Sequence, residues 1–310
     1  MKAESNRGVA LLSVMFILTL LTVFAVYLVE ADYLLLRRAE NQRMTEQGAQ
    51  LALGSEQWAA RVLQRDLDAG DVDHPGEDWN KLGTPVAVDD GKMRTSIRDL
   101  QSRFNLNNLS TRDEVWYPAF KRLLVLLEID PNLAEAVVDW IDADQERTHG
   151  AGAEDLEYLL YDPPYRAANR RFADLGELAS VQGITSEVMH RLAPYVAVIP
   201  DERTTRLNIN TCSALLLQIL GVEMTAADAE SLVAARGETG FESVEAFLQR
   251  PELAGSANQT AEPMISLNSN FFLVRSQVTL QRLNLSMDSV IKRNSEDFSV
   301  RVINRQRSYL

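Results

Sequence analysis

The residues most able to do chemistry are carboxylates gathered in one segment, residues 142–169. Asp142, Asp144 and Glu146 alternate along the chain, and Glu154 and Asp155 return two more carboxylates after a stretch that contains two glycines. Hard oxygen ligands at this density suit Ca²⁺, which takes ~6–8 oxygens in flexible geometry. The alternation also matches the first ligand positions of a calcium-binding loop. The segment is therefore the best candidate for a metal site in the chain, with Ca²⁺ as the ion that its oxygens suit.

Other interpretations of this acidic segment stay open. It does not fit an EF-hand, because Arg147 stands where that loop requires glycine and Ala153 where it requires glutamate. A solvated acidic loop without a ligand is the simplest interpretation of the composition alone. An acid–base carboxylate pair for glycoside hydrolysis is a third. It is disfavoured, because the aromatic residues of a sugar-binding groove are not concentrated here.

The rest of the sequence contains no further catalytic constellation. His74, His149 and His190 are scattered without the i, i+4 spacing of a helical zinc site. There is no GxSxG, no phosphate-binding glycine loop and no CxxC. Cys212, which precedes an apolar helical segment, is predicted to be a buried packing residue. We therefore expect no enzyme activity.

A repeat within residues 102–262 supplies the elements around the acidic segment. The phrase RFNLNNLS, from Arg103, is echoed by RLNINTCS, from Arg206. Two apolar helical segments joined by a short turn follow each phrase. Similar phrases close the two copies, FADLGEL from Phe172 and FESVEAF from Phe241. This pattern predicts an inserted helical domain built from repeated units that share one core.

The second copy resembles the helix-hairpin-helix module of DNA-binding and competence proteins. Such a hairpin needs glycines that let backbone N–H groups approach a phosphate, with lysine or arginine beside them. The two turns here, residues 128–132 and 221–225, carry carboxylates instead, and Pro131 lacks the N–H donor. The repeats are thus predicted to be scaffold. A periplasmic DNA-uptake or DNA-binding protein is the alternative function.

Residues 69–101 and 263–310 predict the two parts of one antiparallel sheet. The run TPVAVDDGKMRTSIR, from Thr84, alternates on both sides of Asp90-Gly91, which is a hairpin signal. Three β-rich runs with polar breaks between them follow the helical domain, at residues 271–280, 285–292 and 298–303. We expect the preceding helix to lie across this sheet.

A single helix is predicted from Val9 to Asp68. Residues 9–29 carry no charge, and at ~1.5 Å per residue they span roughly 31 Å, the thickness of a hydrocarbon core. Residues 30–68 contain no proline and predict a stalk. A cleaved secretory signal and an ordinary single-pass anchor are the alternatives for the apolar part. Lys2 and Arg7 predict a cytoplasmic amino terminus, with everything after Val29 on the other side of the membrane.

The overall composition limits the classes of partner. The chain of 310 residues has a net charge of −13, which argues against a nucleic-acid surface. Hydrophobic residues make up 46% of the chain, enough to build cores. The single cysteine excludes an internal disulfide.

The first residues resemble the class III leader (residues 1–8) of type IV pilins and pseudopilins. This resemblance implies that a prepilin peptidase cuts after Gly8 and leaves Val9 as a methylated amino terminus. The fifth residue after the cut is normally glutamate, and here it is Ser13. A carboxylate in hydrocarbon is costly unless it is paired, and a subunit at the leading end of a filament has no neighbour ahead to neutralise. Serine avoids this cost, because its hydroxyl can bond to a backbone carbonyl within the helix.

Over its whole length the chain resembles the K-type minor pseudopilins of type II secretion systems. The resemblance rests on the leader without the usual glutamate and on the following phrases: QLALGSEQWA, RFNLNNL, DWIDADQE with GAEDLEYL, YRAANR, and FFLVRSQVTL. It implies an α+β fold, in which a long transmembrane and stalk helix packs on a small antiparallel sheet. A large all-α domain with helix-hairpin-helix-like repeats, residues 102–262, is inserted into that sheet.

The resemblance also implies a function. The protein would sit at the tip of the periplasmic pseudopilus with the I- and J-type minor pseudopilins, and would help to initiate assembly and the export of folded exoproteins. Other pseudopilins, the inner-membrane assembly platform and prepilin peptidase would be further partners, and nucleic acid would not. Two calcium ions are implied, with ligands carried over from the family's acidic motif: Asp142, Asp144, Gln145, Glu154 and Asp155.

Overall fold

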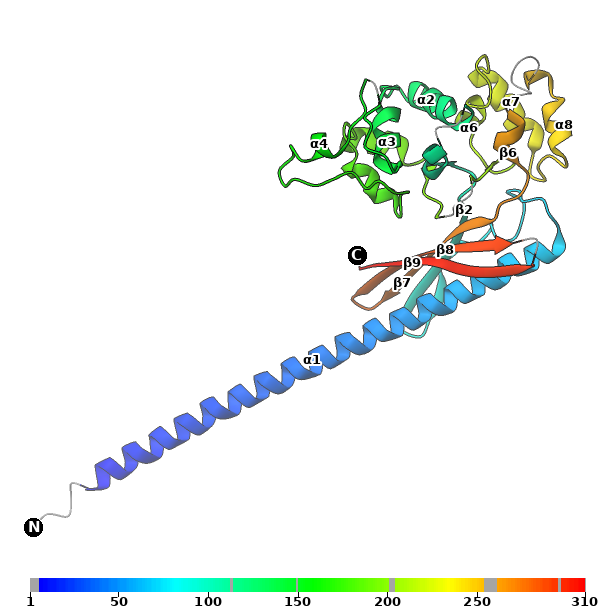
Figure 1. The fold of residues 1–310 in the computed structure, drawn as a ribbon. Helices are drawn as coiled ribbons and strands as arrows, with labels where there is room; N and C mark the ends of the chain where they lie inside the picture. The colour runs from blue at the N-terminus through cyan, green and yellow to red at the C-terminus, as the bar shows by residue number, and fades with distance from the viewer. Residues whose placement is uncertain are drawn as a thin grey trace, which may run out of the picture.

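The computed structural model describes residues 6–111, 114–148, 150–200, 204–253, 261–294 and 297–309. Its longest element is helix α1 (Asn6–Ala69), of 64 residues, which at 1.5 Å per residue is roughly 96 Å long. Figure 1 shows that most of α1 projects away from the rest of the molecule. The helix is long and apolar enough to cross a membrane, by length and composition. Met44 is the first described residue along the helix whose side chain is buried.

A five-stranded antiparallel sheet packs on the second half of α1, with strand order β1-β2-β7-β8-β9. The strands are β1 (Val86–Val88), β2 (Gly91–Asp99), β7 (Phe271–Leu280), β8 (Leu283–Asn294) and β9 (Ser299–Tyr309). The predicted hairpin around Asp90-Gly91 is therefore confirmed, as are the three later strands. Strands β8 and β9 extend beyond the predicted bounds.

Alternating side chains of the sheet meet α1. Ala59 and Leu63 of the helix pack with Ile97, Phe272 and Val274. Ser55 lies within hydrogen-bond distance of two buried hydroxyls, at 2.6 Å from Thr95 and 2.7 Å from Ser276. These contacts fix both the rotation of α1 and its position along the sheet.

The helix approaches the β7–β8 hairpin closely at one glycine. A Cβ at Gly48 would lie 2.6 Å from the Leu283 side chain, closer than carbon atoms can approach. Glycine therefore lets the helix and the hairpin pack against each other at this point.

The regular elements between the neighbouring strands β2 and β7 are mostly helices (Figure 1). Its α-helices are α2 (Trp116–Leu126), α3 (Leu133–Ile141), α4 (Asp155–Tyr158), α5 (Ser186–Leu192), α6 (Ala214–Gln218), α7 (Ala226–Arg236) and α8 (Val244–Leu248). Its 3₁₀ turns are η1 (Leu106–Thr111), η2 (Leu175–Ser180), η3 (Pro251–Leu253) and η4 (Glu262–Met264).

Two details differ from the sequence prediction of an all-α insertion ending at residue 262. Strands β3 (Phe104–Asn105) and β4 (Val196–Ala197) pair in parallel, and so do β5 (Leu207–Asn208) and β6 (Ile265–Ser266). Because β6 pairs with β5, the helical part continues past 262 and the large sheet resumes at Phe271. Pairs this short give no periodic signal in a sequence.

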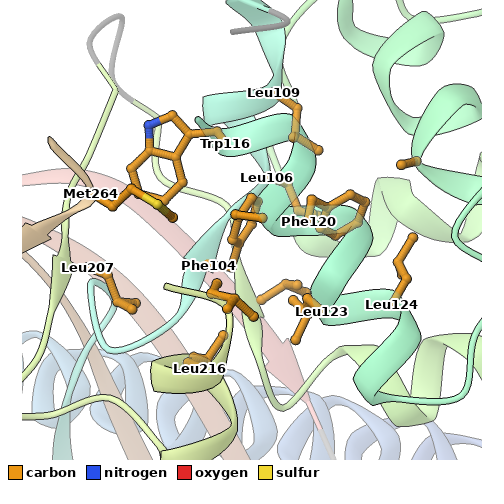
Figure 2. Packing of buried hydrophobic residues seen from close by; sticks show 14 of the residues in the cluster. Phe104, Leu106, Leu109, Trp116, Phe120, Leu123, Leu124, Leu207, Leu216 and Met264 are labelled. Carbon is orange, nitrogen blue, oxygen red and sulfur yellow. The ribbon is translucent and has the colours of Figure 1, made fainter. Parts of the chain in front are cut away.

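Both copies of the repeat contribute to one core. Phe104, Phe120 and Leu123 of the first copy lie in the same buried cluster as Leu207 and Leu216 of the second, and Figure 2 shows these side chains converging. The shared core that the repeat predicts is present.

The two copies also make the same polar contact. Asn107 accepts a hydrogen bond from the backbone N–H of Phe172 at 2.8 Å and donates to its carbonyl at 3.0 Å. Asn210 does the same with Phe241, at 2.7 and 3.2 Å. Each buried asparagine thus ties the opening phrase of its copy to the closing phrase. The sequence repeat is therefore also a repeat of backbone contacts.

Candidate metal centre

Helices α3 and α4 bring the acidic segment together from its two ends. Asp142 directly follows the buried helix α3, and Glu154 directly precedes α4. Side chains of α3 hold the connecting loop through hydrogen bonds. Asp139 accepts hydrogen bonds from the backbone N–H of Thr148 at 3.0 Å and from its hydroxyl at 2.5 Å. One turn earlier, Glu135 accepts from the backbone N–H of Ala151 at 2.8 Å.

Three of the five predicted ligands converge. Asp142, Asp144 and Glu154 each offer one carboxylate oxygen, and these oxygens all lie within 4.8 Å of one another. Calcium–oxygen bonds of about 2.3–2.6 Å separate two ligands of one ion by at most about 5 Å. The spacing therefore fits three oxygens around a single calcium ion.

Glu154 carries the strongest sign that a cation belongs here. Its side chain is buried, with 4% exposed, and in the described part of the chain neither carboxylate oxygen has a hydrogen-bond partner. A buried carboxylate without donors or a counter-charge is costly. Burial, with added repulsion from Asp139, Asp142, Asp144 and Asp155, raises the pKa of Glu154 to about 7. A bound divalent cation would relieve this cost.

The other two predicted ligands, Gln145 and Asp155, lie beside this group and face each other. The Gln145 side-chain amide donates to Asp155 Oδ2 at 3.4 Å. Asp155 also accepts from the backbone N–H of Ala167 at 3.1 Å and pairs with Arg166 at 3.4 Å. Its carboxylate therefore already has donors, unlike that of Glu154.

The sequence interpretation left out a residue of this region, Asn169. Its Oδ1 is buried and has no hydrogen-bond partner among the described residues, and its backbone N–H donates to the carbonyl of Trp140 at 3.0 Å. Asn169 belongs to the phrase YRAANR, which gives no periodic signal. His149, the histidine of the acidic segment, lies outside the described residues.

A second acidic group forms elsewhere, from Asp66, Asp73 and Glu77. It already contains a cation. The guanidinium of Arg293 lies 2.6 Å from Asp66 and 2.5 Å from Asp73. This group is therefore an internal ion-pair network that ties the end of α1 to β8, and it needs no metal.

Comparison with known proteins gives a family for this arrangement. A family model described as "Type II secretion system (T2SS), protein K" matches residues 102–201, and a second one with the same description matches residues 207–268. The type II secretion system protein K of Pseudomonas aeruginosa is 36% identical over 97% of this chain and 93% of its own length. That of Klebsiella pneumoniae is 34% identical, with 95% of each chain covered.

The chain belongs to the protein K family of type II secretion systems.

A solved structure agrees with this assignment. The chain is similar to one in the crystal structure of the GspK–GspI–GspJ complex from the type 2 secretion system of enterotoxigenic Escherichia coli, with a TM-score of 0.79 and 27% sequence identity. The match covers 87% of this chain and 99% of the other. Members of the protein K family are structural pseudopilin components of the secretion system. The DNA-binding alternative is therefore not favoured.

Proposed function

We propose that this protein is a minor pseudopilin at the tip of the periplasmic pseudopilus, where it helps to initiate assembly and the export of folded proteins across the outer membrane. One observation carries the proposal. A helical body of about 170 residues is inserted between two neighbouring strands of a small sheet, and it lies at the end of the molecule opposite the amino terminus (Figure 1). A subunit stacked ahead in a filament would meet this body, whereas an end position leaves it free.

Ser13 supports the same position. Its hydroxyl donates to the carbonyl of Val9 at 2.9 Å, so its polar group is satisfied within its own helix. A glutamate at this depth would need a neighbour's amino group to offset its charge. A leading subunit lacks that neighbour, and serine makes it unnecessary.

The amino-terminal segment supports insertion in the inner membrane. We propose that prepilin peptidase cuts between Gly8 and Val9 and that Val9 becomes the methylated terminus. The apolar run from Val9 to Val29 would then cross the membrane once, with its first residues facing the cytoplasm and the folded part in the periplasm. The assembly platform and the other pseudopilins would contact it there.

The acidic segment supports calcium binding, and the family resemblance implies two ions. We propose that Asp142, Asp144 and Glu154 hold the first, because their oxygens are spaced for one ion and Glu154 has no other partner among the described residues. Gln145 and Asp155 would complete the ligand set. Calcium would neutralise this group and fix the loop between α3 and α4.

We propose that the helix-hairpin-helix-like repeats are a structural scaffold and do not bind nucleic acid. The turn between α2 and α3 carries the exposed carboxylates of Glu128 and Asp130, which would repel a phosphate. The repeats instead contribute the core that holds α3 and the acidic loop.

Crosslinking in cells tests the tip position. A photocrosslinker at Glu40 or Glu46, both exposed on α1, should report the neighbours of this subunit in the presence of all pseudopilins. We expect crosslinks to the I- and J-type minor subunits on one side only. Repeated crosslinks to the major subunit on both sides would overturn the tip position and place the protein in the shaft.

A further inference from the structure

An open cavity of about 230 Å³ lies where the sheet meets the helical segment. It is on the sheet face that α1 does not cover. Ile97 and Val274 pack toward α1, so the alternate residues Arg98 and Arg275 point to the opposite face. Arg98 lies directly opposite Leu273 in the β2–β7 pair. Two sheet strands thus bring arginines to the mouth of one cavity.

The angle between the two parts of the molecule is fixed at this corner. Leu100 and Phe271, at the ends of β2 and β7, pack with Ala197 and Ile199 of the helical segment. Leu273 and Val290 pack against this cluster and also line the cavity. The cavity is therefore a fixed hollow with partly apolar walls.

Arg103 projects from the helical side into the same corner. It is half-buried and donates a long hydrogen bond, 3.5 Å, to the carbonyl of Ala193. Burial, followed by repulsion from Arg98 and Arg275, lowers the pKa of Arg103. Three guanidinium groups therefore share this corner.

The carboxylates that line the cavity are already engaged. Asp288 forms a bidentate ion pair with Arg275, with N–O distances of 2.7 and 2.5 Å. Asp174 accepts a hydrogen bond from the backbone N–H of Gly176 at 2.5 Å. Over the described ranges, no carboxylate lies within 4 Å of the guanidinium of Arg98 or Arg103. A half-buried cation without a counter-charge is costly, and the arginine fork matches a carboxylate in two-point geometry.

We propose that Arg98 and Arg103 form a binding site for the carboxylates of an acidic peptide segment that docks in this cavity. The apolar side chains of Leu273 and Val290 would contact its apolar side chains. The side-chain amides of Asn304 and Gln306, which also line the cavity, could bond to its backbone. The chain as a whole has a net charge of −13. The attraction for an acidic ligand would therefore come from the arginines of this corner and not from the overall charge.

A lipid headgroup does not suit the site, because the site lies too far from the apolar run. Ile97, next to Arg98, lies in the same buried cluster as Val62 of α1, which is 33 residues after Val29. At 1.5 Å per residue this is about 50 Å along the helix. The site therefore suits a peptide ligand away from the membrane, which the proposed function does not include.

Fluorescence anisotropy on the full chain in non-ionic detergent tests the site. The probe is a fluorescein-labelled peptide of alternating glutamate and valine, and its partner carries glutamine in place of glutamate. Arg98→Gln and Arg103→Gln should each weaken binding of the acidic peptide at least tenfold. The matched control is Arg94→Gln, which removes the same charge from the same face of β2 but does not line the cavity. It should change binding less than twofold.

Other outcomes would overturn the proposal. Equal weakening by all three variants would indicate unspecific attraction, and equal binding of the glutamine peptide would remove the role of the carboxylates. Displacement of the peptide by millimolar inorganic phosphate, with phosphate itself binding more tightly, would indicate a site for free anions instead. Arg98 is exposed, so its variant should keep the parent melting temperature. Arg103→Lys keeps the charge at the half-buried position and should retain more binding than Arg103→Gln.

Discussion

At the scale of single residues, the acidic loop shows that neighbours in sequence can have opposite roles. Glu154 is buried with no donor in the described part of the chain, whereas Asp155 next to it receives donors from Arg166 and Ala167. The first carboxylate has no counter-charge among the described residues, and the second is paired with Arg166. Predictions about calcium and pH belong to Glu154 and the oxygens around it.

Calcium should stabilise the folded protein. If a bound ion links Asp142, Asp144 and Glu154, a free calcium concentration a hundredfold above Kd adds about 2.7 kcal/mol to the free energy of unfolding. The melting temperature of the full chain in detergent should therefore rise with calcium and fall with chelator. Asp144→Asn should remove most of this difference.

Glu146→Gln is the matched control for that experiment. It removes a charge from an exposed neighbour that lies outside the converging group, so it should keep the response to calcium. Superimposed melting curves of the parent with calcium and with chelator would contradict calcium binding and favour a solvated acidic loop without a ligand.

In chelator, stability should fall as the pH rises. The pKa of Glu154 is about 7 in the folded state against an ordinary value of 4.5, so the folded state retains the proton more strongly between these values. The free energy of unfolding therefore decreases from about pH 4.5 to about pH 7 and then levels off. Calcium requires the ionised carboxylate, so its affinity should rise across the same window.

The variant Glu154→Gln isolates this effect. Burial also raises the pKa of Asp99 and of Asp73 to about 6, and both shifts have the same sign. The measurement is therefore the difference in melting temperature between parent and variant, in chelator, at pH 5 and pH 7.5. A difference that does not change with pH would contradict the burial of an unpaired carboxylate at this position.

At the scale of elements, two asparagines tie each repeat together. The opening and closing phrases of each copy lie far apart in sequence, and Asn107 and Asn210 bridge them through the backbone of Phe172 and Phe241. The helices of each copy lie between these phrases. The contact therefore closes each unit.

Removing either asparagine should destabilise the helical segment. Asn107→Ala and Asn210→Ala each leave one buried N–H and one buried C=O of the partner phenylalanine unpaired, at about 1–3 kcal/mol per group. We expect each to lower the free energy of unfolding by about 2–6 kcal/mol, measured by denaturant titration. Asn132→Ala, at an α3 cap without a side-chain bond, should cost much less; equal losses at all three sites would remove the special role of the bridges.

At the scale of the whole molecule, the long helix and the inserted body act at opposite ends. The first half of α1 is exposed along its apolar residues, and the helical body lies beyond the sheet (Figure 1). In the proposed function the apolar end would lie in the membrane, and the inserted body at the other end would block further stacking. The assembly prediction follows from this arrangement.

Ser13→Glu should not improve incorporation into the pseudopilus. In a leading subunit the new carboxylate gains no amine ahead of it, so it must protonate or reach toward the interface. The measurement is crosslinking yield from Glu46 in cells that carry either version. Thr19→Glu, which adds a carboxylate deeper in the same helix, is the control. A higher yield for Ser13→Glu alone would show that this position normally faces a neighbour's amine, as in the shaft.

The sequence alone determined the features that depend on local patterns. The uncharged run after Gly8, the Asp90-Gly91 hairpin, the later strands and the paired repeats were all predictable, because each follows from periodicity, turn chemistry or self-similarity within a short window. The acidic segment was predictable as a group of carboxylates for the same reason.

Only the tertiary structure decided which of these residues meet. Asp142 and Glu154 converge because α3 and α4 pack on one core, while Asp155 turns to Arg166. The short β5–β6 pair and the cavity that Arg103 shares with Arg275 join segments far apart in the chain. Such contacts depend on packing between distant elements, and a local pattern of residues carries no record of them.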